Sequence, residues 1–155
     1  MGPDVNTAAV EFSPFVTKRA EDGTAELYFE RGDRVNQDVF VVTIDAQGAT
    51  LGPAVAVAEV NSSANDGRPT VRFDGREMLL HSNRDGRGGN VDLFVSTRQS
   101  PDHPWWTPVP VEELNVSPMH EIQPYLSKDA RTVVFTRGAF QVNDIWMATR
   151  TPSGN

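Results

Sequence analysis

The chain has 155 residues, 38% of them apolar, with a formal net charge of −7 and no cysteine. This length is enough for one domain. A net negative charge argues against binding to nucleic acid or to anionic membranes, since both need clustered Lys and Arg. Disulfides and thiolate metal sites are excluded. No apolar run approaches the ~20 residues of a membrane-spanning helix, so we expect no membrane insertion.

The first third of the chain alternates short apolar runs with turn signals. Its second run predicts a strand with Leu27 and Phe29 on one face and Tyr28 on the other. The third run is rich in Val and Phe, which is typical of a strand covered on both faces. Four strands are expected here, at residues 11–17, 26–31, 38–44 and 51–60.

The remaining two thirds repeat this pattern. Turns are predicted at Asp74-Gly75 and in the glycine-rich stretch 85–89. No segment has the sustained i, i+3, i+4, i+7 apolar series of an amphipathic helix. We therefore predict an all-β protein. The later strands that matter most below are expected at residues 106–114, 122–127, 132–136 and 144–149.

An internal repeat organises the whole chain. Five kinds of landmark recur three times in the same order, 52 to 55 residues apart: Asn6, Asn61 and Asn115; Glu11, Asp66 and Glu121; Pro14, Pro69 and Pro124; Arg31, Arg84 and Arg137; Asp38, Asp92 and Asp144. A period near fifty with about four short strands per copy is typical of a β-propeller blade. We expect one propeller-type domain over residues 1–155, with blades at about 7–60, 61–114 and 115–151.

Three stretches carry a resemblance to a known family. They are SNRDGRGGNVDLFVSTR (82–98), FTRGAFQVNDIWMATR (135–150) and FERGDRVNQDVFVVT (29–43). The chain resembles the TolB-type β-propeller repeat, a relative of the WD repeats. The resemblance implies the propeller fold, a bacterial origin and a periplasmic or secreted location. It implies no particular function, because such propellers have many unrelated roles.

The number of blades raises the question of closure. Propellers have about four to eight blades, so three cannot close a ring. The third copy ends after its third strand, whereas residues 2–6 resemble the end of a fourth strand and the following link. We therefore expect a homodimer in which two chains close a six-bladed ring with twofold symmetry. The alternatives are a fragment of a longer propeller and an open three-blade array.

The candidate ligand-binding residues lie on the innermost strands. The acids Glu11, Asp66 and Glu121 are expected at the mouth of the central channel, together with Arg68 and Gln123, which each precede a proline. A ring of carboxylates is suited to a cation or to a basic or sugar-like ligand. The alternative is that the acids cap backbone N–H groups in the entry loops.

A second set of charged residues is interpreted as structural. Each repeated arginine ends a second strand and each repeated aspartate begins a third strand. We expect three ion pairs that tie the hairpins: Arg31 with Asp38, Arg84 with Asp92 and Arg137 with Asp144.

Motifs of catalysis and cofactor binding are missing from the sequence. His81, His103 and His120 lack metal-ligand spacing. Residues 85–92 lack the closing Glu of a calcium loop, so a glycine-rich hairpin is favoured, and calcium is the open alternative to no cofactor. Neither a nucleophile elbow nor a phosphate loop occurs.

Three similar copies supply like residues, whereas catalysis needs unlike ones. The sequence therefore predicts a non-enzymatic scaffold that presents its channel and rim to a protein, carbohydrate or other small ligand, with no catalytic residues. The alternative is a hydrolase acting on a sugar or lactone with carboxylates at the channel mouth.

Overall fold

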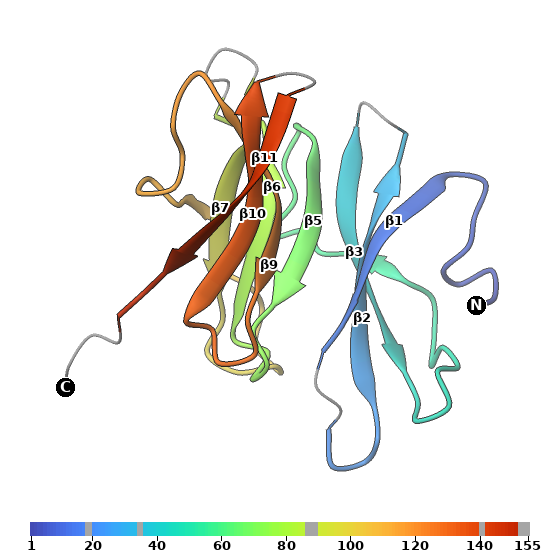
Figure 1. Cartoon of the computed structure of the whole chain (residues 1–155). Coiled ribbons are helices and arrows are strands. Elements are labelled where there is room, and N and C mark those ends of the chain that lie inside the picture. The colour runs from blue at the N-terminus through green and yellow to red at the C-terminus, as the bar shows by residue number, and fades with distance from the viewer. Residues whose placement is uncertain (18–19, 34–35, 86–89, 140–141, 152–155) are drawn as a thin grey trace.

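The chain folds into three antiparallel sheets that follow one another along the sequence (Figure 1). The computed structural model describes residues 1–17, 20–33, 36–85, 90–139 and 142–151, and none of these is helical. The eleven strands are β1 (Val10–Val16), β2 (Ala25–Gly32), β3 (Gln37–Ile44), β4 (Val55–Ala56), β5 (Asp66–Val71), β6 (Glu77–Ser82), β7 (Asp92–Thr97), β8 (Val109–Pro110), β9 (His120–Leu126), β10 (Thr132–Ala139) and β11 (Val142–Thr149).

Each sheet is one propeller blade, with its strands in sequence order. Blade 1 is β1-β2-β3-β4, blade 2 is β5-β6-β7-β8, and blade 3 is β9-β10-β11. This confirms the all-β propeller prediction. None of the described segments is a helix long and apolar enough to cross a membrane.

The fourth strands are much shorter than expected. In place of strands at 51–60 and 106–114, only β4 and β8 pair with the third strands, over two residues each. Prolines at 53 and 108 precede the paired residues and have no N–H to extend the ladder. After the paired residues the chain turns away into the link to the next blade.

The main core lies between blades 1 and 2, because β2 is buried on both faces. Tyr28 faces blade 2 and belongs to a cluster with Leu80, Phe94 and Trp105. Leu27 and Phe29 lie on the opposite face, as predicted. The cluster between blades 2 and 3 is smaller: its buried members are Leu79, Leu126 and Ala130.

The two outward faces of the array differ. On blade 1, Val5 of the N-terminal segment packs on Leu27 and Phe29, and Ala54 adds to the cover. On blade 3 the apolar residues of β11 stay exposed, among them Ile145 and Met147.

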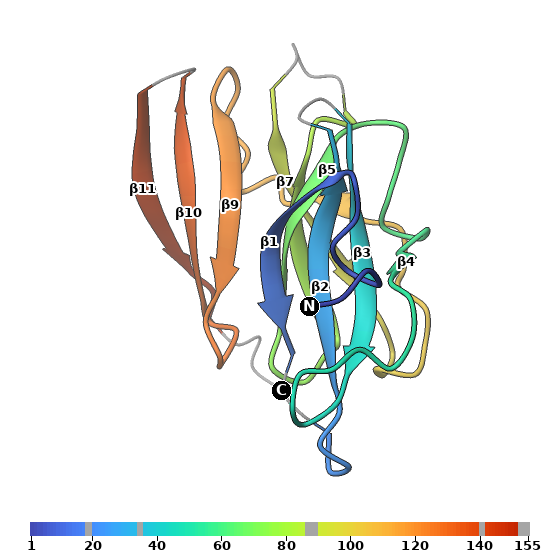
Figure 2. The same cartoon turned by 90° about the vertical axis from the view of Figure 1, so that its right-hand side faces the viewer.

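The first strand of each blade lies on the inner side of the array. β5 packs beside both β1 and β9, and Figure 2 shows the three strands next to one another between the outer parts of the blades. Residues that occupy equal positions on these strands are therefore brought together.

Candidate functional site

Three unusual backbone positions mark the inner strands. Ser13, Arg68 and Gln123 have φ of 52°, 53° and 56°, in the left-handed region that side chains other than glycine rarely adopt. Each precedes a proline and lies where the pairing of its strand with the next shifts register, as in a β-bulge. Strained positions that recur in this way often mark binding sites.

The three positions converge on one small pocket of about 220 Å³. Its lining consists of the bulge residue, the proline and the next residue of each inner strand: Ser13, Pro14, Phe15, Arg68, Pro69, Thr70, Gln123, Pro124 and Tyr125. None of these described lining residues is acidic. The guanidinium of Arg68, the amide of Gln123 and the hydroxyl of Ser13 make the pocket a hydrogen-bonding site with one positive charge.

A buried carboxylate beneath the pocket holds Arg68. The side chain of Glu30 is almost inaccessible, and its Oε1 lies 3.5 Å from Nε of Arg68. Glu30 Oε2 accepts the backbone N–H of Arg68 at 2.9 Å, and Oε1 accepts the hydroxyl of Ser13, also at 2.9 Å. A Cβ on the neighbouring Gly67 would overlap Glu30 Oε2. Glu30 therefore fixes two of the three bulge residues, while the guanidinium of Arg68 remains partly exposed.

A buried histidine lies beside Gly67, the residue before Arg68. His81 on β6 pairs with Gly67 of β5. Burial, assisted by the charge of Arg68, lowers its pKa to about 3. Its Nδ1 is buried without a hydrogen-bond partner. His81 is therefore uncharged at neutral pH, and Arg68 supplies the positive charge of this site.

The predicted ring of acids does not line the pocket. Glu11, Asp66 and Glu121 instead bind the repeated arginines, with N–O distances of 3.0 Å to Arg31, 2.5 Å to Arg84 and 2.7 Å to Arg137. Asp66 and Glu121 are fully buried. Of the sequence-predicted site residues, the structure brings only Arg68 and Gln123 together at the pocket.

The acids also cap the entry loops, which was the alternative interpretation. Glu11 accepts the N–H and hydroxyl of Thr7, and Asp66 accepts those of Ser62. In the third copy Val116 follows the repeated asparagine, as Thr7 and Ser62 do, and it bonds Glu121 through its backbone N–H but offers no hydroxyl. Burial raises the pKa of Glu121 despite the opposing effect of Arg137, whereas the Thr7 hydroxyl lowers that of Glu11.

The salt bridges also correct the expected hairpin ion pairs. Arg31 lies opposite Asp38 in the strand register, and Arg137 lies opposite Asp144. Arg84 lies beyond β6, and Ser82 is the residue opposite Asp92. All three arginines nevertheless reach the first strand, where a backbone carbonyl of the preceding link accepts a second bond: Val5 O for Arg31, Val60 O for Arg84 and Leu114 O for Arg137.

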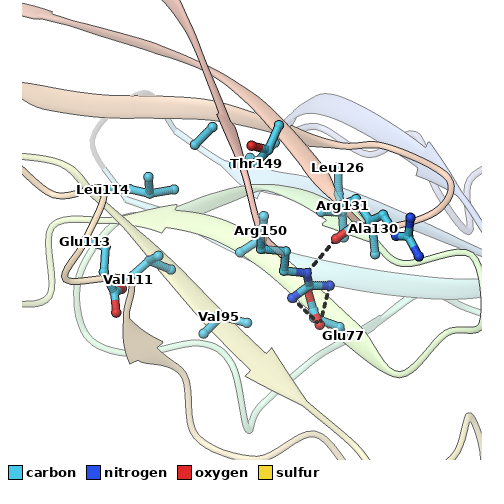
Figure 3. Close-up of a pocket in the computed structure, with 13 residues that line it drawn as sticks. Glu77, Val95, Val111, Glu113, Leu114, Leu126, Ala130, Arg131, Thr149 and Arg150 are labelled. Carbon is cyan, nitrogen blue, oxygen red and sulfur yellow. Dashed lines mark hydrogen bonds and ion pairs between the residues drawn. The ribbon is translucent and has the colours of Figure 1, made fainter. Parts of the chain in front are cut away.

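A larger cavity of about 420 Å³ separates blades 2 and 3 (Figure 3). At its edge Arg150 binds Glu77 at 3.0 Å and donates to Ala130 O at 2.6 Å. The equal space between blades 1 and 2 is filled by Trp105, over which Arg98 lies at 4.3 Å. The cavity between blades 2 and 3 thus corresponds to the space that Trp105 fills between blades 1 and 2.

Among the described residues, no group of three or more His, Asp or Glu side chains is placed to hold a metal ion. The glycine-rich stretch considered as a calcium loop falls largely on residues 86–89, which lie outside the described residues.

Sequence reasoning missed Glu30 and His81. Both directly follow the buried apolar runs of their second strands, Leu27–Phe29 and Met78–Leu80, and a polar residue that continues such a run was the available signal. The three X-Pro dipeptides were recognised, but a left-handed residue before proline is not what that dipeptide favours.

No family model and no curated protein matches the chain. Solved structures do match, among them three with identities of 11 to 13%. A thermostable family-43 glycoside hydrolase has 13% identity and a TM-score of 0.57, covering 98% of this chain and 62% of its own. TolB from Acinetobacter baumannii has 11% identity and a TM-score of 0.53, covering 88% and 29%.

The Hadza microbial sialidase Hz136 has 12% identity and a TM-score of 0.51, covering 83% of this chain and 32% of that one. The chain thus spans less than two thirds of each of these proteins. They are propeller-fold proteins, and at these identities the likeness supports the β-propeller fold and does not identify the TolB repeat family.

Proposed function

We propose that this protein is a non-enzymatic propeller scaffold whose inner pocket binds an anionic group of a small or peptide ligand. The observation that carries the proposal is the convergence of Ser13, Arg68 and Gln123 from three blades on one pocket without a lining acid. Glu30 holds the backbone and the guanidinium of Arg68 without lining the pocket.

The chemistry of the lining defines the ligand class. A guanidinium binds carboxylates with charge-assisted hydrogen bonds, and the amide and hydroxyl add neutral ones. A volume of about 220 Å³ is below the roughly 300–1,000 Å³ of drug-sized sites. The pocket therefore fits a headgroup, such as the carboxylate end of a sugar acid or of a peptide.

The test is a titration with sodium glucuronate, followed by NMR, with glucose as the uncharged control. We expect shifts of the amides of residues 13, 68 and 123 with glucuronate and not with glucose. Arg68→Gln should weaken binding about 10- to 100-fold, the effect of losing a charged hydrogen bond. The matched control is Arg76→Gln, an exposed arginine in the turn between β5 and β6, which should bind normally. Absence of shifts with glucuronate would contradict the proposal.

The second candidate is a hydrolase, and buried Glu30 is the observation that favours it. Glycoside cleavage usually needs two carboxylates about 5–10 Å apart. Glu30 is hydrogen-bonded to Ser13 and Arg68, and the described lining offers no second acid. A screen of nitrophenyl glycosides and lactones separates the two functions. Turnover that is lost in Glu30→Gln would favour the enzyme and overturn the scaffold.

A further inference from the structure

The outer edge of blade 3 is unfinished within the described residues. β3 and β7 are followed in their sheets by β4 and β8, whereas β11 is the last strand of its sheet. Val142, Ile145, Trp146 and Met147 on β11 are all exposed, Ile145 to 81%. An exposed apolar edge strand is a template for pairing with another chain.

In the other two blades an asparagine side chain forms hydrogen bonds with the backbone of the third strand. After β4, the side chain of Asn61 accepts from Val39 N at 2.8 Å and donates to Val39 O at 2.9 Å. After β8, Asn115 does the same to Leu93, at 2.9 and 3.0 Å. The amide thus takes the place of a residue of a neighbouring strand.

The N-terminus carries a third copy of this link. The N–H groups of Val5 and Asn6 bind Gly2 O at 3.1 and 3.0 Å, as those of Val60 and Asn61 bind Val57 O. The carbonyl of Val5 accepts from its repeated arginine just as that of Val60 does. Asn6, however, is exposed and donates to Met1 O.

In blade 3 the counterpart of Val39 and Leu93, the residues bound by Asn61 and Asn115, is Ile145. It follows Asp144 as Val39 follows Asp38 and Leu93 follows Asp92. The N-terminal segment and β11 lie on different sides of the molecule in both views (Figures 1 and 2). The link of one chain therefore cannot reach its own β11 in this fold.

A contact between blade 3 of one copy and blade 1 of another would have uncharged residues at the position of the interblade ion pair. Neighbouring blades are tied by Arg98 with Glu26 and by Arg150 with Glu77. On blade 3 the residue equal in register to these glutamates is Thr132, which pairs with Thr149 as Glu26 pairs with Thr43. On blade 1 the residue equal to the arginines is Ile44, which follows Thr43. Neither side would bury an unpaired charge, whose cost is high.

An apolar stripe crosses the open face of blade 3. Tyr125, Val134 and Met147 lie side by side across its three strands. Tyr125 is 61% and Met147 67% exposed, which suits burial against another blade.

We propose that a second copy of this chain completes blade 3, with Asn6 of one copy clasping the backbone of Ile145 of the other. The amide oxygen accepts the N–H of Ile145 and the amide nitrogen donates to its carbonyl. Blade 1 of each copy then covers the stripe of Tyr125, Val134 and Met147. The reciprocal contact gives a closed twofold dimer.

Sedimentation analysis at micromolar concentration tests the proposal. The wild-type mass should be twice 17.0 kDa. Asn6→Ala removes two hydrogen bonds from each of the two contacts and should weaken the dimer about tenfold or more. Met147→Glu should weaken it as well, because it places a charge in the stripe. The control is Val109→Glu, at an apolar residue on β8 that is 56% exposed, which should leave the dimer intact.

Cross-linking identifies the contact itself. Because the chain has no cysteine, Asn6→Cys and Ile145→Cys can be prepared separately, mixed and treated with a short bismaleimide. The mixture should give a cross-linked heterodimer, and Asn6→Cys mixed with Trp106→Cys should not. A folded wild-type monomer at all concentrations would overturn the proposal. So would a dimer that withstands both Asn6→Ala and Met147→Glu.

Discussion

At the residue scale, His81 makes the stability of the protein depend on pH. Its pKa is lowered from 6.5 to about 3, first by burial and then by the charge of Arg68. In the unfolded chain the imidazole binds a proton below about pH 6.5, while in the folded chain it stays neutral. The contribution is therefore fully present above pH 6.5 and is lost as the pH falls toward 3.

The expected effect is measurable by urea unfolding at pH 7.5 and 5.0. Because the folded state excludes the proton, the wild type should lose about 2 kcal/mol more between these pH values than His81→Gln, following a slope of ~1.4 kcal/mol per pH unit. His103→Gln, at an exposed position, should lose as much as the wild type. Equal losses in His81→Gln and the wild type would show that His81 is charged in the folded state.

Some single residues were predictable from the sequence, and others were not. The faces of Leu27, Tyr28 and Phe29 followed from strand alternation alone. The partner of each repeated arginine did not, because an arginine side chain reaches several backbone positions. In the structure each guanidinium also donates to a backbone carbonyl of the preceding link, which the strand pattern does not reveal. Ala130, with φ of 57°, holds the turn position where blades 1 and 2 have Gly23 and Gly75, so tertiary packing overrode local preference there.

At the scale of elements, the contact between blades depends on one of two adjacent tryptophans. Trp105 is 5% and Trp106 66% exposed. Trp105 meets the ring of Tyr28 edge-on at 6.3 Å and lies under Arg98. Adjacent extended residues face opposite sides, but the sequence pattern did not reveal which side was buried.

Alanine substitution separates the two tryptophans. Trp105→Ala should lower the free energy of unfolding by about 3–5 kcal/mol, because it empties the core between blades 1 and 2. Trp106→Ala should change it by less than about 0.5 kcal/mol. Thermal and urea unfolding measure both values. Similar losses in the two variants would mean that the blades do not pack through Trp105.

At the scale of the whole molecule, the repeat predicted the architecture because every blade buries its apolar faces against its neighbours in the same way. The pocket was less predictable. Its lining comes from three bulges, and the sequence marks only their prolines. The acids predicted at the channel mouth instead accept hydrogen bonds from backbone N–H groups of the links that precede them.

The strength of packing falls from the first interface to the second. Blades 1 and 2 share a cluster that contains Tyr28, Phe94 and Trp105, whereas the small cluster between blades 2 and 3 borders a cavity of about 420 Å³. Every residue of β6 is buried, while nearly all of β11 is exposed. Regions with few buried contacts open at lower free energy than the core.

Hydrogen exchange should therefore proceed in a fixed order. In Asn6→Ala, which lacks the proposed clasp, amides of β11 should exchange at least about tenfold faster than those of β6, because blade 3 opens without blades 1 and 2. In the wild type, protection of β11 should rise with protein concentration while that of β6 stays constant, since only β11 would be covered by a second copy. Uniform protection of all three blades in the variant would mean that the chain opens as one cooperative unit, and the weak second interface would then have no separate energetic role.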